Sequence, residues 1–226
     1  MKKINLILLN TILIIIAFFN FGCENKNNIN IVEKKDPFYD EIYKKIYIAP
    51  GEKDEFYWFM SGGFSGNVTV HAIPSGKLIK TIPVFSVFPE NGYGYDEETK
   101  NMLMTSNGFV PWDDAHHPKL SITDGMPDGK WLFINGNNAP RIARINLQTF
   151  ETDEIIEIPN CAGNHASPFT TENTEYLMSA TRFSIPIPQN NNIQVSSAEQ
   201  GAFKGTINMI KVEKNGRMNL ELQILV

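Results

Sequence analysis

The sequence predicts an all-β chain that forms a partial β-propeller of about three blades. From residue 51 onward, short runs of β-branched and aromatic residues alternate with turns rich in Gly, Pro and Asn. This pattern occurs three times, and its first two occurrences both close with Ile-Pro, at 82–83 and 158–159. No stretch after residue 50 shows the periodicity of a long helix. Repeated meandering strands joined by tight turns are typical of propeller blades.

The expected strands are short runs bounded by turn residues. They cover residues 55–60, 67–73 and 77–85 in the first repeat, 130–134, 141–147 and 153–158 in the second, and 175–178, 206–212 and 218–226 in the third, where 184–203 is an insertion. Residues 36–47 form either a short amphipathic helix or an irregular lead-in. A β-sandwich also contains many short strands, but the matching ends of the repeats favour the propeller.

Three blades cannot close a ring, so a chain of this length would leave apolar surface and strand edges open. Residues 220–226 have the composition of a strand and carry no terminating signal. The sequence therefore predicts a truncated propeller that is inactive by itself.

The N-terminus predicts export. Lys2 and Lys3 precede an apolar run from Ile4 to Phe19, as in a secretory signal peptide. Gly22 and Cys23 at its end indicate lipoprotein processing, with a lipid attached to Cys23. We thus divide the chain into a signal peptide (1–23), a polar tether and lead-in (24–50) and the blades (51–226). An uncleaved anchor is the alternative. Either reading gives a periplasmic protein that meets the membrane only through its N-terminal anchor.

Composition excludes some functions. The chain has 226 residues, of which 42% are hydrophobic and 20% charged, as in soluble globular proteins. Its net charge of −5 offers no basic patch, so nucleic acid is not an expected partner. Cys23 and Cys161 are the only cysteines, and lipidation of Cys23 would leave Cys161 without a disulfide partner. Cys161 lies four residues before His165, a spacing that would suit a metal ligand, but a packing role is the favoured interpretation.

The four histidines are unevenly placed. His71 lies in the middle of an expected strand and is interpreted as an ordinary strand residue. His116 and His117 immediately precede one apolar strand, and His165 precedes the strands of the next repeat. In a propeller, the loops that enter the first strand of each blade converge near the axis, so these three imidazoles are expected to meet. Two adjacent histidines can both face inward only if the backbone bends, which Pro118 would help to fix. Imidazole suits copper, zinc, iron and nickel.

A series of motifs narrows this choice. They are Phe59-Met60-Ser61-Gly62-Gly63, Ile82-Pro83-Val84-Phe85, Gly92-Tyr93-Gly94-Tyr95-Asp96-Glu97-Glu98, Asp114-Ala115-His116-His117-Pro118, Asp128 to Asn135, Arg141 to Ile145, Gly163 to Phe169, and Gln223 to Val226. In this order they resemble the N-terminal propeller of nitrous-oxide reductase, in particular the group with Sec-type signals. The resemblance covers residues 55–226.

The resemblance implies a seven-bladed propeller with a tetranuclear copper–sulfide cluster, bound by seven histidines, that reduces nitrous oxide to dinitrogen and water in denitrification. The family's His-His pair corresponds to His116 and His117, and the single histidine of the next blade to His165. Asp114 would orient an imidazole; an exposed loop carboxylate is the alternative.

The resemblance also implies partners and further cofactors. These are cytochrome c or a similar electron donor, a homodimer when the protein is complete, a C-terminal cupredoxin domain with a dinuclear copper centre, and calcium. The cupredoxin domain has no counterpart in this chain, and calcium would belong to the part of the family fold that the chain does not match.

A function from another class competes with this one: an exported propeller lipoprotein that binds a partner and has no redox role. Two enzymatic readings are weaker. The Gly-rich segment 61–66 leads into a strand instead of a helix, unlike a phosphate-binding loop. A hydrolase triad of Ser121, His117 and Asp114 lacks the spacing of a nucleophile elbow.

Overall fold

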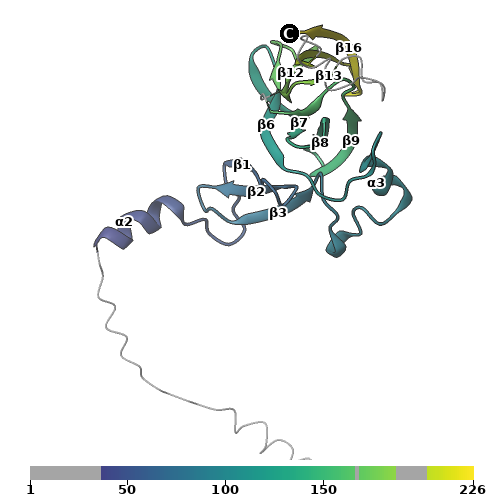
Figure 1. Cartoon of the computed structure of the whole chain (residues 1–226). Helices are drawn as coiled ribbons and strands as arrows, with labels where there is room; N and C mark the ends of the chain where they lie inside the picture. The colour runs from purple at the N-terminus through teal and green to yellow at the C-terminus, as the bar shows by residue number, and fades with distance from the viewer. Residues whose placement is uncertain (1–36, 166–167, 187–202) are drawn as a thin grey trace, which may run out of the picture. The chain divides into compact units, whose positions relative to one another are not determined.

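A computed structural model describes residues 37–165, 168–186 and 203–226 (Figure 1). Helix α2 (Pro37–Ile46) forms in the segment for which the sequence left helix or lead-in open. Two short helical segments, η1 (Pro89–Asn91) and α3 (Glu97–Met102), follow the first sheet. Asp96 caps α3, because its side chain accepts a hydrogen bond of 2.7 Å from the Thr99 amide. No helix in the described ranges is long and apolar enough to cross a membrane.

All other described elements are strands. The first half of the chain contains β1 (Phe56–Ser61), β2 (Asn67–Ile73), β3 (Leu78–Pro83), β4 (Met104–Thr105), β5 (Gly108–Phe109), β6 (Ala115–Thr123) and β7 (Met126–Gly136). The second half contains β8 (Arg141–Asn146), β9 (Glu151–Glu157), β10 (Ala162–Asn164), β11 (Phe169–Thr170), β12 (Tyr176–Phe183), β13 (Ile185–Pro186), β14 (Phe203–Lys204), β15 (Thr206–Val212) and β16 (Met218–Leu225).

The strands form three antiparallel meander sheets. Their orders are β1-β2-β3, β6-β7-β8-β9 and β10-β12-β15-β16, with β11 pairing with β12. Two small hairpins, β4-β5 and β13-β14, complete the described sheets. Each strand of the first two sheets pairs with its neighbour in the sequence, as in Figure 1. This confirms the all-β class, and the open series of meander sheets is that of a partial propeller.

Three strands are longer than expected: β7 covers 126–136 instead of 130–134, β12 covers 176–183 instead of 175–178, and β6 is the third. The sequence suggested that a loop carries His116 and His117 into an apolar strand, whereas β6 already begins at Ala115 and includes both histidines. The reason is that residues 116–119 of β6 are two histidines, a proline and a lysine, so its first half lacks the apolar alternation of a recognisable strand. In contrast, β2 and β15 have the predicted limits, 67–73 and 206–212.

The core consists of two apolar layers on opposite faces of the middle sheet. Leu132, Ile134 and Ile145 pack with Val68 and Val70 of the first sheet. The alternate residues face the other way: Phe133 and Ile142 pack with a group contributed mainly by the third sheet, namely Ile158, Cys161, Leu177, Ile210, Val212 and Met218. Because successive side chains of a strand point to opposite faces, a sheet buried on both faces requires continuous apolar runs. This accounts for the apolar run 131–134.

The outer sheets retain exposed apolar side chains. On β1, the exposed fractions of Phe56, Tyr57 and Trp58 are 64%, 57% and 55%. On β16, Ile224 and Leu225 are about half exposed, at 50% and 51%. These are the open surfaces that the sequence predicted for a partial propeller.

Candidate metal centre

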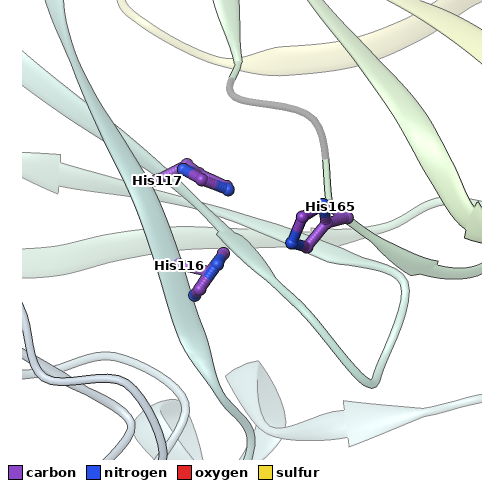
Figure 2. Close-up of side chains that lie close together, drawn as sticks. All are labelled: His116, His117 and His165. Atoms are coloured by element: carbon purple, nitrogen blue, oxygen red, sulfur yellow. The ribbon is translucent and has the colours of Figure 1, made fainter.

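The three histidines singled out by the sequence lie together. One ring nitrogen from each of His116, His117 and His165 lies within 4.8 Å of the other two. The ring centroids are 4.1 Å apart for His116 and His117, and 5.1 Å apart for each of these rings and His165. Figure 2 shows the pair on one strand and His165 on a separate segment, with the three rings facing a common space. The convergence expected from the strand order is therefore present.

A β-bulge brings the two adjacent histidines to the same side. In a regular strand, neighbouring side chains point to opposite faces. Here His116 pairs with Asn135 and Lys119 pairs with Phe133, so two residues of β6 oppose one residue of β7. His117 occupies the bulge with a φ of 52°, a left-handed conformation in which histidine is enriched. The bend that the sequence demanded is thus made by His117, one residue before Pro118.

Pro118 fits this place in the ladder because it has no amide hydrogen to donate. His117 and Pro118 have no paired residues on β7. A proline at position 118 therefore interrupts no residue pair between the two strands. The proline therefore accompanies the bend, as expected, although it is not the residue with the unusual φ.

His165 follows the short strand β10 in the third sheet. Its backbone amide donates a 3.3 Å hydrogen bond to the carbonyl of Ala180 on β12. Two residues earlier, Gly163 has a φ of +87°, and a Cβ there would stand 2.3 Å from the carbonyl oxygen of Asn137. Only glycine accommodates this conformation and this close approach. It allows the loop after β7 and the segment before His165 to touch.

Asp114 lies beside the histidine pair and is buried, with an exposed fraction of 4%. Its Oδ1 stands 3.6 Å from Nδ1 of His116, and its Oδ2 accepts a 2.7 Å hydrogen bond from the Asn137 side chain. The alternative of an exposed loop carboxylate is therefore wrong. Burial, together with repulsion from His116 and His165, lowers the pKa of His117, while Asp114 opposes this. His117 is consequently neutral at pH 7 and keeps a lone pair for a metal ion.

Two other candidates lie elsewhere. His71 on β2 contacts the Thr69 hydroxyl, with Nε2 at 3.2 Å, and the described residues within metal-ligand reach of the cluster do not include it. Cys161 packs in the core, and its thiol donates to the Gly163 carbonyl at 3.2 Å. Burial raises the pKa of Cys161 to about 11, although hydrogen bonds with Thr206 and Thr181 oppose the shift. Cys161 is thus a protonated packing residue, as interpreted from the sequence. Cys23 lies outside the described residues.

Sequence reasoning missed Asp113. Its carboxylate accepts hydrogen bonds from the backbone amides of Asp114 (2.7 Å), Asn138 (3.0 Å) and Ala139 (3.1 Å), and lies 3.5 Å from the Arg141 guanidinium. The side chains of Asp113 and Arg141 are both fully buried. The sequence did contain a signal for this role, namely two consecutive acidic residues before the histidine pair. Asp114 faces the histidines, and Asp113 anchors the loop that follows β7.

Fold and site together define a metalloprotein candidate: meander sheets that present an all-imidazole donor set. No family model matches the chain. Curated relatives do match, and they are named nitrous-oxide reductase. The proteins from Pseudomonas fluorescens, Stutzerimonas stutzeri and Cupriavidus necator are 37%, 38% and 30% identical over 82%, 68% and 80% of this chain. The chain is therefore a homologue of nitrous-oxide reductase, as the motifs indicated.

The matched part is a minor share of these relatives. The chain spans 28%, 24% and 29% of their respective lengths. Among solved structures, a dihydro-heme d1 dehydrogenase aligns over 76% of this chain and 27% of its own, with 10% identity and a TM-score of 0.43. A likeness of this degree says nothing about function.

Proposed function

We propose that His116, His117 and His165 bind copper in a protein that reduces nitrous oxide to dinitrogen and water. In this proposal the copper belongs to a tetranuclear copper–sulfide cluster, of which this chain supplies three of the ligands. The observation that carries the proposal is the convergence of the three imidazoles, with ligand atoms within 4.8 Å of one another. The names of the homologues supply the substrate, and the family resemblance of the sequence motifs supplies the metal.

The donor set fits copper. Imidazole nitrogen is a good ligand for copper, whereas calcium and magnesium require oxygen ligands. Among the described residues, the cluster contains three histidines and no carboxylate or thiolate. Copper bound there supplies the redox chemistry. The protein's own contribution is to hold the three rings in place and to keep them able to bind.

Each neighbouring group has a definite task in this proposal. The bulge at His117 directs two consecutive side chains to one side, and burial keeps the His117 ring neutral. Asp114 faces Nδ1 of His116 at 3.6 Å and would favour the tautomer with its hydrogen on Nδ1. That tautomer leaves Nε2 of His116 free to bind metal.

The proposal also covers features of the whole protein and of residues outside the described ranges. The remaining cluster ligands, a dinuclear copper centre in a cupredoxin domain, a cytochrome c-type electron donor and a homodimer are proposed for the whole protein. Export to the periplasm and lipid attachment at Cys23 belong to it as well. Mass spectrometry of the mature N-terminus tests this part, because Cys23→Ser should abolish an acyl modification. Cleavage after another residue, without an acyl chain, would exclude lipidation.

The decisive experiment compares histidine variants of the full gene product that carries this chain. His116→Ala, His117→Ala and His165→Ala should each lower the copper content and remove nitrous-oxide reduction. Changing a residue that supports a ligand typically costs about 10–100-fold in metal affinity or activity, and loss of a ligand should exceed this. His71→Ala is the matched control and should leave both near normal. Asp114→Asn should fall between.

Copper per protein, the visible absorption of the cluster and turnover are the measurements. If His165→Ala retains the full cluster and turnover, the proposed site is wrong. A wild-type protein that binds no copper at these residues would instead favour the partner-binding lipoprotein.

A further inference from the structure

A row of buried polar side chains links the histidine site to the interior of the third sheet. Asn135, Asn164 and Asn208 have no exposed surface, and Ser179 is 2% exposed. Asn208 donates to the Ser179 hydroxyl at 3.3 Å, and Ser179 donates to the Asn164 side chain at 3.4 Å. Asn135 in turn donates from Nδ2 to the backbone carbonyl of Asn164. Only the Nδ2 group of Asn135 is paired in this way, because its buried Oδ1 has no hydrogen-bond partner among the described residues. An unpaired buried group costs about 1–3 kcal/mol, so the Nδ2 bond is the interaction that holds this side chain.

Asn135 occupies a singular place in this row. It lies on β7 directly opposite His116 of β6 in the strand register. The carbonyl that it binds belongs to Asn164, the residue before His165. Asn135 is in the second sheet and Asn164 in the third. One side chain therefore joins the strand opposite one histidine to the peptide that carries another.

His165 has few restraints of its own. Its side chain is exposed, and its backbone amide makes a 3.3 Å hydrogen bond to Ala180. The residue before it is held more firmly: Asn164 is completely buried, and its side-chain oxygen accepts hydrogen bonds from Cys161 and Ser179, each at 3.4 Å. The placement of His165 therefore depends on Asn164. The Asn164 side chain donates a 3.5 Å hydrogen bond to the Arg141 carbonyl of β8, and the bond from Asn135 ties the Asn164 carbonyl itself to β7.

We propose that Asn135 is a positioning residue that sets the placement of His165 relative to His116 by tying the Asn164 carbonyl to β7. Its significance for copper rests on the proposed function. A ligand atom displaced from its productive position weakens a metal site, and supporting residues of this kind typically contribute about 10–100-fold in metal affinity.

Asn135→Leu and Asn135→Ala in the full gene product test this proposal. Both lose the hydrogen bond. Alanine leaves a cavity, whereas leucine keeps the branching and the number of heavy atoms of asparagine, so an effect common to both variants belongs to the bond. Thr152→Val is the matched control. Thr152 is also buried, and its hydroxyl donates a 2.8 Å hydrogen bond from β9 to the Pro83 carbonyl of β3, which likewise joins two sheets.

The first measurement is the position of His165 relative to His116 in crystals of the metal-free protein. The second is copper retention against a chelator, with copper located by anomalous scattering. Both Asn135 variants should show His165 displaced while His116 and His117 keep their places, and should hold copper about 10–100-fold less tightly than wild type. Thr152→Val should lower the melting temperature and leave the three histidines and the copper affinity unchanged.

The outcomes separate the two proposals. An unmoved His165 in Asn135→Leu, with copper retention equal to that of wild type, overturns the positioning role even if copper binds as proposed. Displacement of all three histidines in equal measure would also overturn it, because that is the result of general destabilisation. If wild type binds no copper but His165 still moves in the variants, the proposed function fails and the positioning role stands.

Discussion

Replacing Asp113 by alanine would remove a carboxylate that four groups share. It accepts hydrogen bonds from the backbone amides of Asp114, Asn138 and Ala139, and it faces the guanidinium of Arg141 at 3.5 Å. Arg141 is fully buried and lies over the ring of Phe85, with a distance of 4.8 Å from its guanidinium carbon to the ring centroid. Without Asp113 the buried guanidinium would lose its ion-pair partner, and three amides would lose their acceptor.

The expected cost follows from this arrangement. Removing one partner of a buried ion pair destabilises a protein by about 3–5 kcal/mol, because the other charge stays buried and uncompensated. Arg141→Met is the informative comparison, since it leaves Asp113 with its three amide donors and places an apolar side chain against Phe85. Burial raises the pKa of Asp113, whereas the amides and Arg141 lower it. Three of the four groups that stabilise the carboxylate remain in this variant. Arg141→Met should cost less than about half as much as Asp113→Ala.

Hydrogen–deuterium exchange of peptides covering residues 134–142 measures the effect where it arises. If local opening becomes easier by about 3–5 kcal/mol, exchange of the loop amides should accelerate by roughly 150- to 5,000-fold. Peptides from β2 and β3 serve as the internal control and should change little. Asn137 reaches Asp114 from the same loop, so Asp113→Ala should also lower copper retention at the histidines.

Two results would refute the reasoning. Exchange in the Asp113→Ala loop that stays within threefold of wild type would mean that the carboxylate does not anchor it. A larger effect from Arg141→Met than from Asp113→Ala would mean that the guanidinium, and not the set of amide hydrogen bonds, determines the stability of this loop.

Three further predictions concern single side chains. Gly163→Ala should destabilise the fold and reduce copper retention, because the new Cβ would meet the Asn137 carbonyl. The control is Gly76→Ala, since Gly76 has a similar φ of +73° but open space around it. This control should show only the backbone strain of about 1–2 kcal/mol in thermal unfolding. Cys161, with its pKa raised to about 11 by burial, should react with a thiol reagent at pH 8 on the order of 100-fold more slowly in the folded than in the unfolded protein; equal rates would contradict its burial. Burial raises the pKa of Asp128, but hydrogen bonds, foremost from Ser121, outweigh it and lower the pKa to about 2. Its contribution of about 2 kcal/mol should therefore be present above pH 4 and disappear as the pH falls toward 2, and acid unfolding of Asp128→Asn should lack this component.

The alternation of apolar residues between turns was enough to predict individual strands. The limits of β2 and β15 agree with the expected strands because alternating apolar residues between turns specify both the strand and its buried face. The meeting of His116, His117 and His165 was also predicted, from the convergence of successive blades near a propeller axis. The structure places the pair within β6 and His165 after β10, instead of in loops that precede the strands. The relatives confirm the resemblance to nitrous-oxide reductase. That resemblance predicts copper, whereas the residues by themselves allow several metals.

Features that depend on pairing between distant strands were not predictable in this way. The bulge at His117 is defined by the pairing of β6 with β7. The residues around His117 therefore do not show by themselves that β6 contains one residue more than the strand opposite. The same is true of the hydrogen bond from Asn135 to Asn164, which joins residues 29 apart in sequence, and of Asp113 with Arg141, 28 apart. Each of these polar groups reads as an ordinary loop or strand-end residue until the sheets are assembled.

The bulge gives the length of β6 a consequence of its own. Deleting one residue at position 118 would restore strict alternation, and the two imidazoles would then leave the strand on opposite sides although no histidine had been changed. Copying the letters His-His onto a regular strand of another scaffold would fail for the same reason. Transferring this histidine pair to another protein would therefore require the extra residue of the bulge and the left-handed backbone at His117, together with the ligands. The proximity of the two rings depends on the length of β6 as much as on the identity of the side chains.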